Sequence, residues 1–150
     1  MSNTKIKLAS GTNVGMIRSN NEDSYAVCCD LASSNWAISQ VDNYVDLGQL
    51  GSLLIVADGM GGNNAGEVAS SIAVETIRQE FLPDRLESVV SSEKNILEFM
   101  RNVVKQADLN IVDRGRDDSS TRCMGTTVVM AWLIDEKAYV CWCGDSRCYV

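Results

Sequence analysis

Three short segments of the chain combine an acidic side chain with residues that turn the backbone, and each lies next to an apolar run. They are Arg18–Asp23, Asp58–Gly62 and Gly144–Arg147. Carboxylate oxygens are the ligands that hard cations such as Mg²⁺ and Mn²⁺ prefer, and arginine binds phosphate through paired N–H donors. The three segments therefore carry groups that hold a divalent cation and an anion if the fold brings them together.

Asp58 directly follows the continuous apolar run Ser52–Ala57 and precedes a glycine-rich stretch. A carboxylate at the end of a buried strand loses hydration unless a cation or hydrogen-bond donors compensate it. Gly59 can also turn its own carbonyl toward the same ion. Two interpretations follow: a metal site at Asp58, or a helix-capping turn in which Asp58 accepts hydrogen bonds from backbone amides.

Glu22 and Asp23 are adjacent carboxylates at the start of another apolar run, and Arg18 lies in the same polar turn. Adjacent carboxylates are most often solvated surface groups. Arg18 is either a phosphate ligand or the partner of an ion pair with one of these carboxylates. Asp145, in the third segment, either faces a cation or forms a tight turn and pairs with Arg147.

The composition limits the chemistry. The chain has 150 residues, a formal net charge of −7 and no histidine. Without histidine, neither a Ser-His-Asp or Cys-His mechanism nor an imidazole zinc site can be built from it. An acidic chain lacks the clustered Lys and Arg that bind nucleic acid, and no apolar run approaches the roughly 20 residues of a membrane span. We therefore expect no nucleic acid and no membrane partner.

The six cysteines contain no Cys-x-x-Cys pair. Five of them lie in apolar runs typical of strands, namely Cys28, Cys29, Cys141, Cys143 and Cys148. The first ten residues are polar with isolated lysines, unlike a secretory signal. We expect a cytoplasmic, reducing location and free thiols that serve as small core residues. Redox sensing and adventitious metal binding are the alternatives.

Two amphipathic helices are expected in the middle of the chain. Apolar residues at helical spacing predict a helix over Ala65–Phe81, with Asn64 and Glu67 at its N-terminus in a capping-box-like pair and the single proline at its end. A second stripe predicts a helix over Ser92–Arg114 with Gly115 as its C-cap.

Apolar runs predict strands on both sides of these helices. The expected strands cover residues 5–9, 25–29, 52–57, 126–134 and 137–143. The strand that begins at Ser52 is expected to stop at Asp58, and Asp135-Glu136 is expected to form a two-residue hairpin turn. A further strand is expected to begin at Cys148. Residues 36–50 carry no clear pattern.

Together and in this order, the motifs resemble the metal-dependent protein phosphatase family of type 2C. The resemblance rests on Arg18–Asp23, on Val56–Gly62 followed by Ala65–Ala69, on Gly125–Thr127 and on Gly144–Arg147. These motifs span nearly the whole chain, and the long glycine-rich second motif is most similar to the bacterial branch.

The resemblance implies an α+β fold, an antiparallel two-sheet β-sandwich flanked by helices in α-β-β-α layers. The family's catalytic domain is substantially longer, and its C-terminal part carries further strands and two more aspartates that hold metals. We therefore expect residues 1–150 to be the N-terminal part of a single domain that is incomplete at its C-terminus.

The resemblance also implies a site with two or more Mg²⁺ or Mn²⁺ ions. Asp58 would bridge two ions, Gly59 would contribute its carbonyl, and Glu22 would ligate one ion. Asp23 would hold metal-bound water, and Asp145 would serve an additional, weaker ion site. These roles come from the family pattern at matching positions of this chain.

The implied reaction is the hydrolysis of phosphoserine and phosphothreonine in proteins by a water activated at the two ions. Arg18 would hold the substrate phosphate and neutralise charge on it. Many family members have histidine after the Asp-Gly pair, where this chain has Met60, so protonation of the leaving group would fall to water.

Because two metal-holding aspartates of the family have no counterpart in the chain, we expect low or no activity from it. The alternative is a non-catalytic regulatory or binding module that retains the fold. Unpaired strand edges also predict self-association, and the expected macromolecular partner is a phosphoprotein substrate.

Overall fold

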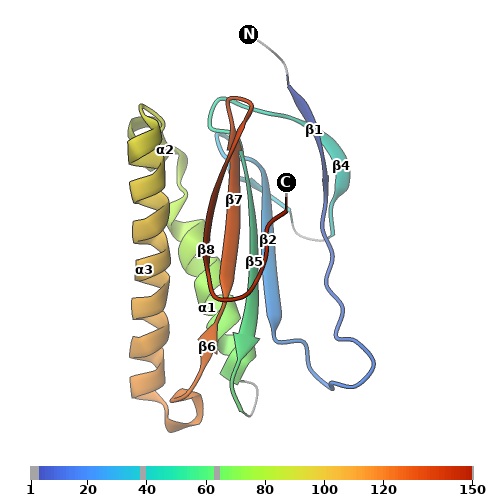
Figure 1. The fold of residues 1–150 in the computed structure, drawn as a ribbon, viewed down its shortest axis with the longest axis vertical. Helices are drawn as coiled ribbons and strands as arrows, with labels where there is room; N and C mark the ends of the chain where they lie inside the picture. Colours follow the sequence, from blue (N-terminus) through green and yellow to red (C-terminus); the bar gives the residue numbers. More distant parts are fainter. Residues whose placement is uncertain (1–3, 38–39, 63–64, 150) are drawn as a thin grey trace.

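The computed structural model describes residues 4–37, 40–62 and 65–149, and Figure 1 shows their arrangement. The strands are β1 (Lys5–Ala9), β2 (Asp23–Asp30), β3 (Asn35–Trp36), β4 (Asp42–Asp46), β5 (Ser52–Met60), β6 (Gly125–Thr126), β7 (Val128–Ile134) and β8 (Lys137–Cys143). The helices are α1 (Ala65–Glu80), α2 (Pro83–Val89), α3 (Glu93–Asp117) and the short 3-10 helix η1 (Ser119–Thr121). None of the helices in these ranges is both long and apolar enough to cross a membrane.

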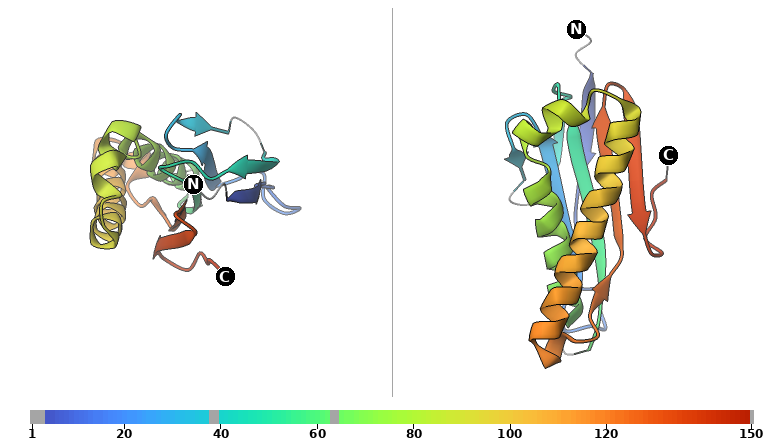
Figure 2. Two further views of the ribbon diagram at one scale, coloured as in Figure 1. Left: turned by 90° about the horizontal axis from the view of Figure 1, so that it is seen from above. Right: turned by 90° about the vertical axis from the view of Figure 1, so that its left-hand side faces the viewer.

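The strands form two antiparallel sheets. The main sheet has the order β3-β2-β5-β7-β8, with β6 paired to the end of β5, while β1 and β4 form a separate two-stranded sheet. Figure 2 shows the helices on one side of the main sheet and the small sheet on the other. The expected mixed fold of helices and antiparallel sheets is confirmed, and the described residues form three of the expected layers, α-β-β.

Strand register separates the two faces of the main sheet. Ala26 and Cys28 of β2 and Ile55 of β5 are buried beneath the helices in the main core. Val27, the residue between the first two, belongs instead to a small second cluster with Leu8 and Val41 under the small sheet. This alternation is the period of two that a strand covered on both faces requires.

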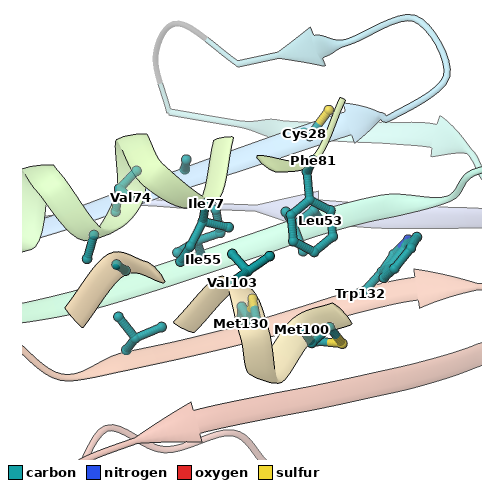
Figure 3. Packing of buried hydrophobic residues seen from close by; sticks show 14 of the residues in the cluster. Cys28, Leu53, Ile55, Val74, Ile77, Phe81, Met100, Val103, Met130 and Trp132 are labelled. Carbon is teal, nitrogen blue, oxygen red and sulfur yellow. The ribbon is translucent and has the colours of Figure 1, made fainter. Parts of the chain in front are cut away.

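An aromatic group anchors the helices on the sheet. Phe81, at the end of α1, packs edge-to-face against Phe99 of α3 and Trp132 of β7, with ring centroids 5.0 and 5.1 Å apart. Figure 3 shows Phe81 and Trp132 beside Leu53 and the methionines of the core. The Trp132 indole is fully buried, and its Nε1–H donates to the Leu50 carbonyl at 2.8 Å. Large buried aromatic rings contribute more to packing than any other side chains.

Both predicted helices are present, with different ends. Pro83 does not simply end a helix: it occupies the first turn of α2, where its fixed φ and missing N–H are favourable. Ser92 caps α3 by accepting from the Asn95 N–H at 3.2 Å. Gly115 is not a C-cap but a buried residue inside α3, packed against the Thr121 carbonyl. Asn64, the expected cap of α1, lies outside the described residues.

Two strand predictions are wrong at their ends. β5 does not stop at Asp58, because Gly59 and Met60 continue it and pair with Thr126 and Gly125 of β6. The strand expected from Cys148 is not formed within residues 146–149. The predicted hairpin turn between β7 and β8 is confirmed, and both of its residues take the positive φ of a type I′ turn without the usual glycine.

All six cysteines are free in the structure, but only Cys28 is a buried core residue. Cys123, Cys143 and Cys148 are exposed, so the expectation that the strand cysteines are core residues is wrong for the last two. Burial raises the pKa of the Cys28 thiol to about 12. The cysteines therefore differ widely in their access to reagents and in their thiolate content.

The two tryptophans on adjacent strands provide a test of the core. Trp132→Ala is expected to lower the free energy of unfolding by about 3–5 kcal/mol, because it leaves a large cavity. Trp142→Ala on β8, where the side chain is 65% exposed, is the control and should cost less than about 1 kcal/mol. Urea unfolding measures both. If Trp132→Ala does not fold, Trp132→Phe leaves the Leu50 carbonyl unpaired and should cost about 1–2 kcal/mol. Equal losses at the two tryptophans would contradict this packing.

A second prediction concerns thiol reactivity at pH 8. Cys123, Cys143 and Cys148 should react rapidly with a disulfide reagent under native conditions. Cys28 should stay unreactive until the protein unfolds, because it is buried and only about one in 10⁴ of its thiols is ionised at that pH. Mass spectrometry of the labelled peptides identifies the modified residues. Rapid labelling of Cys28 without unfolding would show that the main core is open.

Candidate metal centre

The residues predicted to do chemistry meet at one end of the main sheet, where β2 begins and where β5 and β8 end (Figure 1). They come from four parts of the chain: the loop before β2, the first residue of β2, the end of β5 and the bend after β8. The residues are Arg18, Glu22, Asp23, Asp58, Gly59 and Asp145. Antiparallel pairing of β2 with β5 brings the first two motifs together, and the β7–β8 hairpin returns the third to the same end.

Asp23 and Asp58 are direct cross-strand partners. Asp58 is exposed as a residue, but partial loss of hydration at its carboxyl group raises its pKa above the ordinary value. The negative charge of Asp23, a hydrogen bond to it, and the charge of Asp145 raise this pKa further, whereas Arg18 acts in the opposite direction. The carboxylates of Asp23 and Asp145 therefore lie close enough to that of Asp58 to repel it. Without a cation between them, like charges at this spacing destabilise one another.

Thr127 holds Asp58 in position through hydrogen bonds to both main-chain groups of Asp58, its N–H and its carbonyl. The Asp58 N–H donates to Thr127 Oγ1 at 3.1 Å, and the Asp58 carbonyl accepts from the Thr127 N–H at 2.9 Å. The same hydroxyl lies 2.5 Å from Ser146 Oγ, next to Asp145. Gly144 takes a φ of +96° and packs directly on the Thr127 side chain. Thr127 thus joins the end of β5 to the loop that carries the third acidic motif.

Glu22 is held at the start of β2 by its main chain. Its carbonyl accepts from the Gly59 N–H at 3.1 Å and from Ser70 Oγ at 2.7 Å. Its carboxylate, 18% exposed, lies 3.2 Å from the Arg18 guanidinium, whose side chain is 66% exposed. The ion pair between Arg18 and Glu22, one of the two alternatives for this arginine, is therefore present. An exposed pair of this kind contributes only about 0–1 kcal/mol.

Two glycines allow β5 and α1 to approach each other at the site. A Cβ on Gly59 would lie 2.1 Å from the Gly66 carbonyl oxygen and 2.6 Å from the Glu22 carbonyl oxygen. A Cβ on Gly66 would lie 2.9 Å from Glu22 Oε1. Only residues without side chains fit this contact, so the Asp-Gly and Ala-Gly-Glu motifs are needed for packing as well as for any chemistry.

Sequence reasoning gave no role to two residues that organise the site, Thr127 and Ser70. Ser70 is fully buried; its hydroxyl contacts the Glu22 carbonyl and lies 2.9 Å from Ser24 Oγ. A buried serine on an otherwise apolar helix face was the available signal. Glu67 accepts from Asn20 Nδ2 at 2.8 Å and ties α1 to the loop before β2, and its expected capping-box partner, Asn64, lies outside the described residues.

The residues fit a hard divalent cation in kind, because the converging side chains are carboxylates with two aspartates in contact. They fit less well in number. Within the described ranges, no group of three or more Asp, Glu, His or Cys residues has the spacing of a complete metal site. Among the predicted ligands, Asp23 and Asp58 are in contact with each other, while the Glu22 carboxylate pairs with Arg18.

Comparison with known proteins identifies the family. A family model described as protein phosphatase 2C matches residues 40–150. A putative protein phosphatase 2C-type of Streptococcus pyogenes is 28% identical over 142 residues, which cover 95% of this chain and 49% of that protein. The protein phosphatase PhpP of Streptococcus pneumoniae is 29% identical over 136 residues, covering 91% of this chain and 46% of PhpP.

Solved structures show the same fold. A bacterial serine phosphatase matches 97% of this chain and 49% of its own, with a TM-score of 0.69 and 23% identity. The catalytic domain of the serine/threonine protein phosphatase PstP, solved with two manganese ions, matches 96% of this chain and 49% of its own, with a TM-score of 0.61 and 24% identity.

The described residues form an α+β sandwich of helices and antiparallel sheets, as the solved serine phosphatases do, and the chain belongs to the protein phosphatase 2C family. The expected resemblance to the N-terminal region of a bacterial-type member is confirmed. The chain spans about half the length of the curated relatives it matches.

The glycine contact yields a prediction with an internal control. Gly59→Ala is expected to lower the free energy of unfolding by about 1–3 kcal/mol, because its methyl group meets backbone oxygens that cannot move independently. Gly62→Ala, three residues further on, has no atom of the described residues within 4 Å of its new Cβ and should change stability by less than about 0.5 kcal/mol. Urea unfolding compares them. A tolerated Gly59→Ala would show that β5 and α1 are further apart than described.

Proposed function

We propose that the protein hydrolyses phosphoserine and phosphothreonine esters in proteins, with Mg²⁺ or Mn²⁺ held at the site formed by the ends of β2, β5 and β8. The observation that carries the proposal is the contact between Asp23 and Asp58, with Asp145 and Arg18 close enough to affect the same carboxyl group. Family membership and the two manganese ions of the PstP catalytic domain support it.

Asp58 and Asp23 are the residues that would hold a cation, with Asp145 at a further position and the carbonyl of Gly59 beside them. When bound, divalent ions supply a water of lowered pKa and neutralise charge on a phosphoryl group. The contribution of the chain is to hold these carboxylates in fixed positions. The register of β2 with β5 and the two bonds from Thr127 hold the carboxylates in place before any substrate arrives.

Arg18 is the proposed phosphate ligand. In the structure it pairs with Glu22, but the pair is open to solvent at the arginine, whose side chain is 66% exposed, whereas the Glu22 side chain is 18% exposed. Because an exposed ion pair is weak, a phosphate dianion that accepts two N–H bonds can replace Glu22 as the partner. Release from Arg18 would leave the Glu22 carboxylate beside Gly66, where it would ligate an ion.

The chain offers no histidine to transfer protons to the leaving group. Met60, which follows Asp58-Gly59 and is 55% exposed, cannot transfer a proton. Proton transfer is therefore assigned to water, and no covalent intermediate on a side chain is part of the proposal.

A second function has one observation in its favour. The incomplete acidic cluster in the described part of the chain, with Glu22 bound to Arg18, suits a non-catalytic module that retains the phosphatase fold. Such a module would bind phosphoproteins without hydrolysing them. The cytoplasmic location and self-association remain predictions from the sequence.

Hydrolysis of p-nitrophenyl phosphate tests the proposal. The chain should show slow hydrolysis that requires added MnCl₂ and is inhibited by EDTA. Asp58→Asn should reduce the rate by about 100-fold or to the detection limit, because it removes a charge that acts on the metal and phosphate. Arg18→Ala should mainly raise KM, since it removes a phosphate contact.

Glu87→Gln is the matched control, because this exposed carboxylate on α2 lies at the opposite end of the fold from the site (Figure 1). It should leave the rate unchanged. A rate equal in Asp58→Asn and wild type would contradict the assignment. Complete absence of manganese-dependent hydrolysis in the wild type would favour the non-catalytic module.

A further inference from the structure

A cleft of about 310 Å³ adjoins the candidate metal centre along the edge of β2. One wall is the first part of β2, residues 23–25, and the other is a single stripe of α1. The stripe consists of Ser71, Val74, Glu75 and Arg78, at helical positions i, i+3, i+4 and i+7. Asp23 lines this cleft and also contacts Asp58, so the cleft opens directly into the site.

β2 and α1 lie side by side and run in the same direction (Figure 2). At the site end, Ser24 of β2 meets Ser70 of α1. At the other end, Arg78 lies over the ring of Trp36, which pairs with Cys28 of β2. Ser71 and Arg78 are seven positions apart on the helix, which corresponds to about 10 Å along its axis. An extended peptide covers that distance in about three residues.

Part of the backbone edge of β2 carries no strand pairing among the described residues along this cleft, although Thr12 also lines the cleft and the Asp23 N–H already donates to Asn21 Oδ1 at 3.1 Å. β3 pairs with β2 only at Cys28 and Asp30, and the Ala37 N–H bonds to the Val27 carbonyl. Between Asp23 and Ala26, none of the described residues forms a strand on this side of β2. An open strand edge accepts an extended peptide through main-chain hydrogen bonds.

Arg78 is the cation of the cleft and is held in place by two contacts. Its guanidinium lies 5.0 Å from the centroid of the Trp36 ring and 3.5 Å from the Glu75 carboxylate. Its side chain is 43% exposed. A guanidinium fixed on an aromatic face keeps its planar N–H fork available for a second carboxylate, which would compete with the weak surface pair to Glu75.

We propose that this cleft binds the segment of a phosphoprotein substrate that flanks the phosphoresidue, extended along β2, and that Arg78 selects an acidic side chain three positions away from it. The inference rests on the proposed function. To the proposed function it adds a substrate class, namely phosphoproteins with Asp or Glu three positions away from the phosphoresidue. The net charge of −7 makes this selectivity a local property of Arg78, not a property of the whole surface.

Binding of synthetic peptides tests the proposal without relying on turnover. Nine-residue peptides of alanine and glycine carry a fluorescent label and a central non-hydrolysable phosphonate analogue of phosphoserine. They differ at one position, three residues before or after the centre, which is Glu, Gln or Lys. Fluorescence anisotropy with the full chain in MnCl₂ gives each dissociation constant. Thermal melts confirm that the variants Arg78→Gln, Arg78→Lys and Glu75→Gln are folded.

The wild type should bind one of the two Glu peptides about threefold to fivefold more tightly than its Gln counterpart, the upper range for a solvent-exposed ion pair. Arg78→Gln should abolish this preference, and Arg78→Lys should retain part of it. Glu75→Gln should enlarge the preference, because it removes the competing carboxylate. Equal affinities for Glu and Gln, a preference unchanged in Arg78→Gln, or tightest binding of the Lys peptides would overturn the proposal.

Hydrolysis of p-nitrophenyl phosphate, which has no flanking residues, separates this proposal from the proposed function. If the chain hydrolyses the aryl phosphate but binds the Glu and Gln peptides equally well, the proposed role of the cleft is wrong and the proposed function is unaffected. A preference that depends on Arg78 in a chain that does not hydrolyse the aryl phosphate supports the cleft and contradicts catalysis. Failure of all the peptides to bind overturns the cleft.

Discussion

Strands β2 and β5 are held in one register by six residue pairs, from Asp23–Asp58 to Cys28–Leu53. Because side chains alternate between the faces of a strand, this register sets both the core and the site. It turns Cys28, Leu53 and Ile55 toward the helices, where they are buried. The same register places the two aspartates opposite each other at the end of the sheet. A slip of one residue would expose the core and separate the carboxylates.

The register has an electrostatic cost at the site. Two adjacent carboxylates repel, and the burial of the core offsets this repulsion. The ring contacts of Phe81 with Phe99 and Trp132 hold the helices on the sheet, and the Gly59–Gly66 contact holds the start of α1 against the end of β5. Asp23 and Asp58 therefore lie on paired strand ends, whereas Arg18 lies in a loop and Asp145 in the bend after β8.

Local sequence patterns predicted the elements that have a strong hydrophobic period. The apolar stripe from Ile96 to Ile111 predicted α3, and the continuous run after Ser52 predicted β5, because each pattern depends only on neighbouring residues. The short, mostly exposed β4 has no such pattern. The end of β5 was missed because Gly59 and Met60 are held in the strand by β6, more than 60 residues away in the sequence.

The sequence predicted which residues lie at the candidate site, but not the hydrogen bonds that join them. The acidic clusters at strand ends were visible as charges beside apolar runs. The contact of Thr127 with both Asp58 and Ser146 depends on three distant segments, so no local pattern reports it. The ion pair of Arg18 with Glu22 was one of two open alternatives for this arginine, and this pair is the one present in the structure.

The central claim is that the fold holds Asp23 and Asp58 together for a cation at a cost to the ion-free protein. Melting temperatures of the wild type and Asp58→Asn, each with and without MnCl₂ at pH 7, test it most directly. Because ionised Asp58 is destabilised by its neighbours, Asp58→Asn should melt at a higher temperature than the wild type in EDTA. Mn²⁺ should raise the melting temperature of the wild type and not that of the variant. A variant that melts lower in EDTA and still responds to Mn²⁺ would contradict the account.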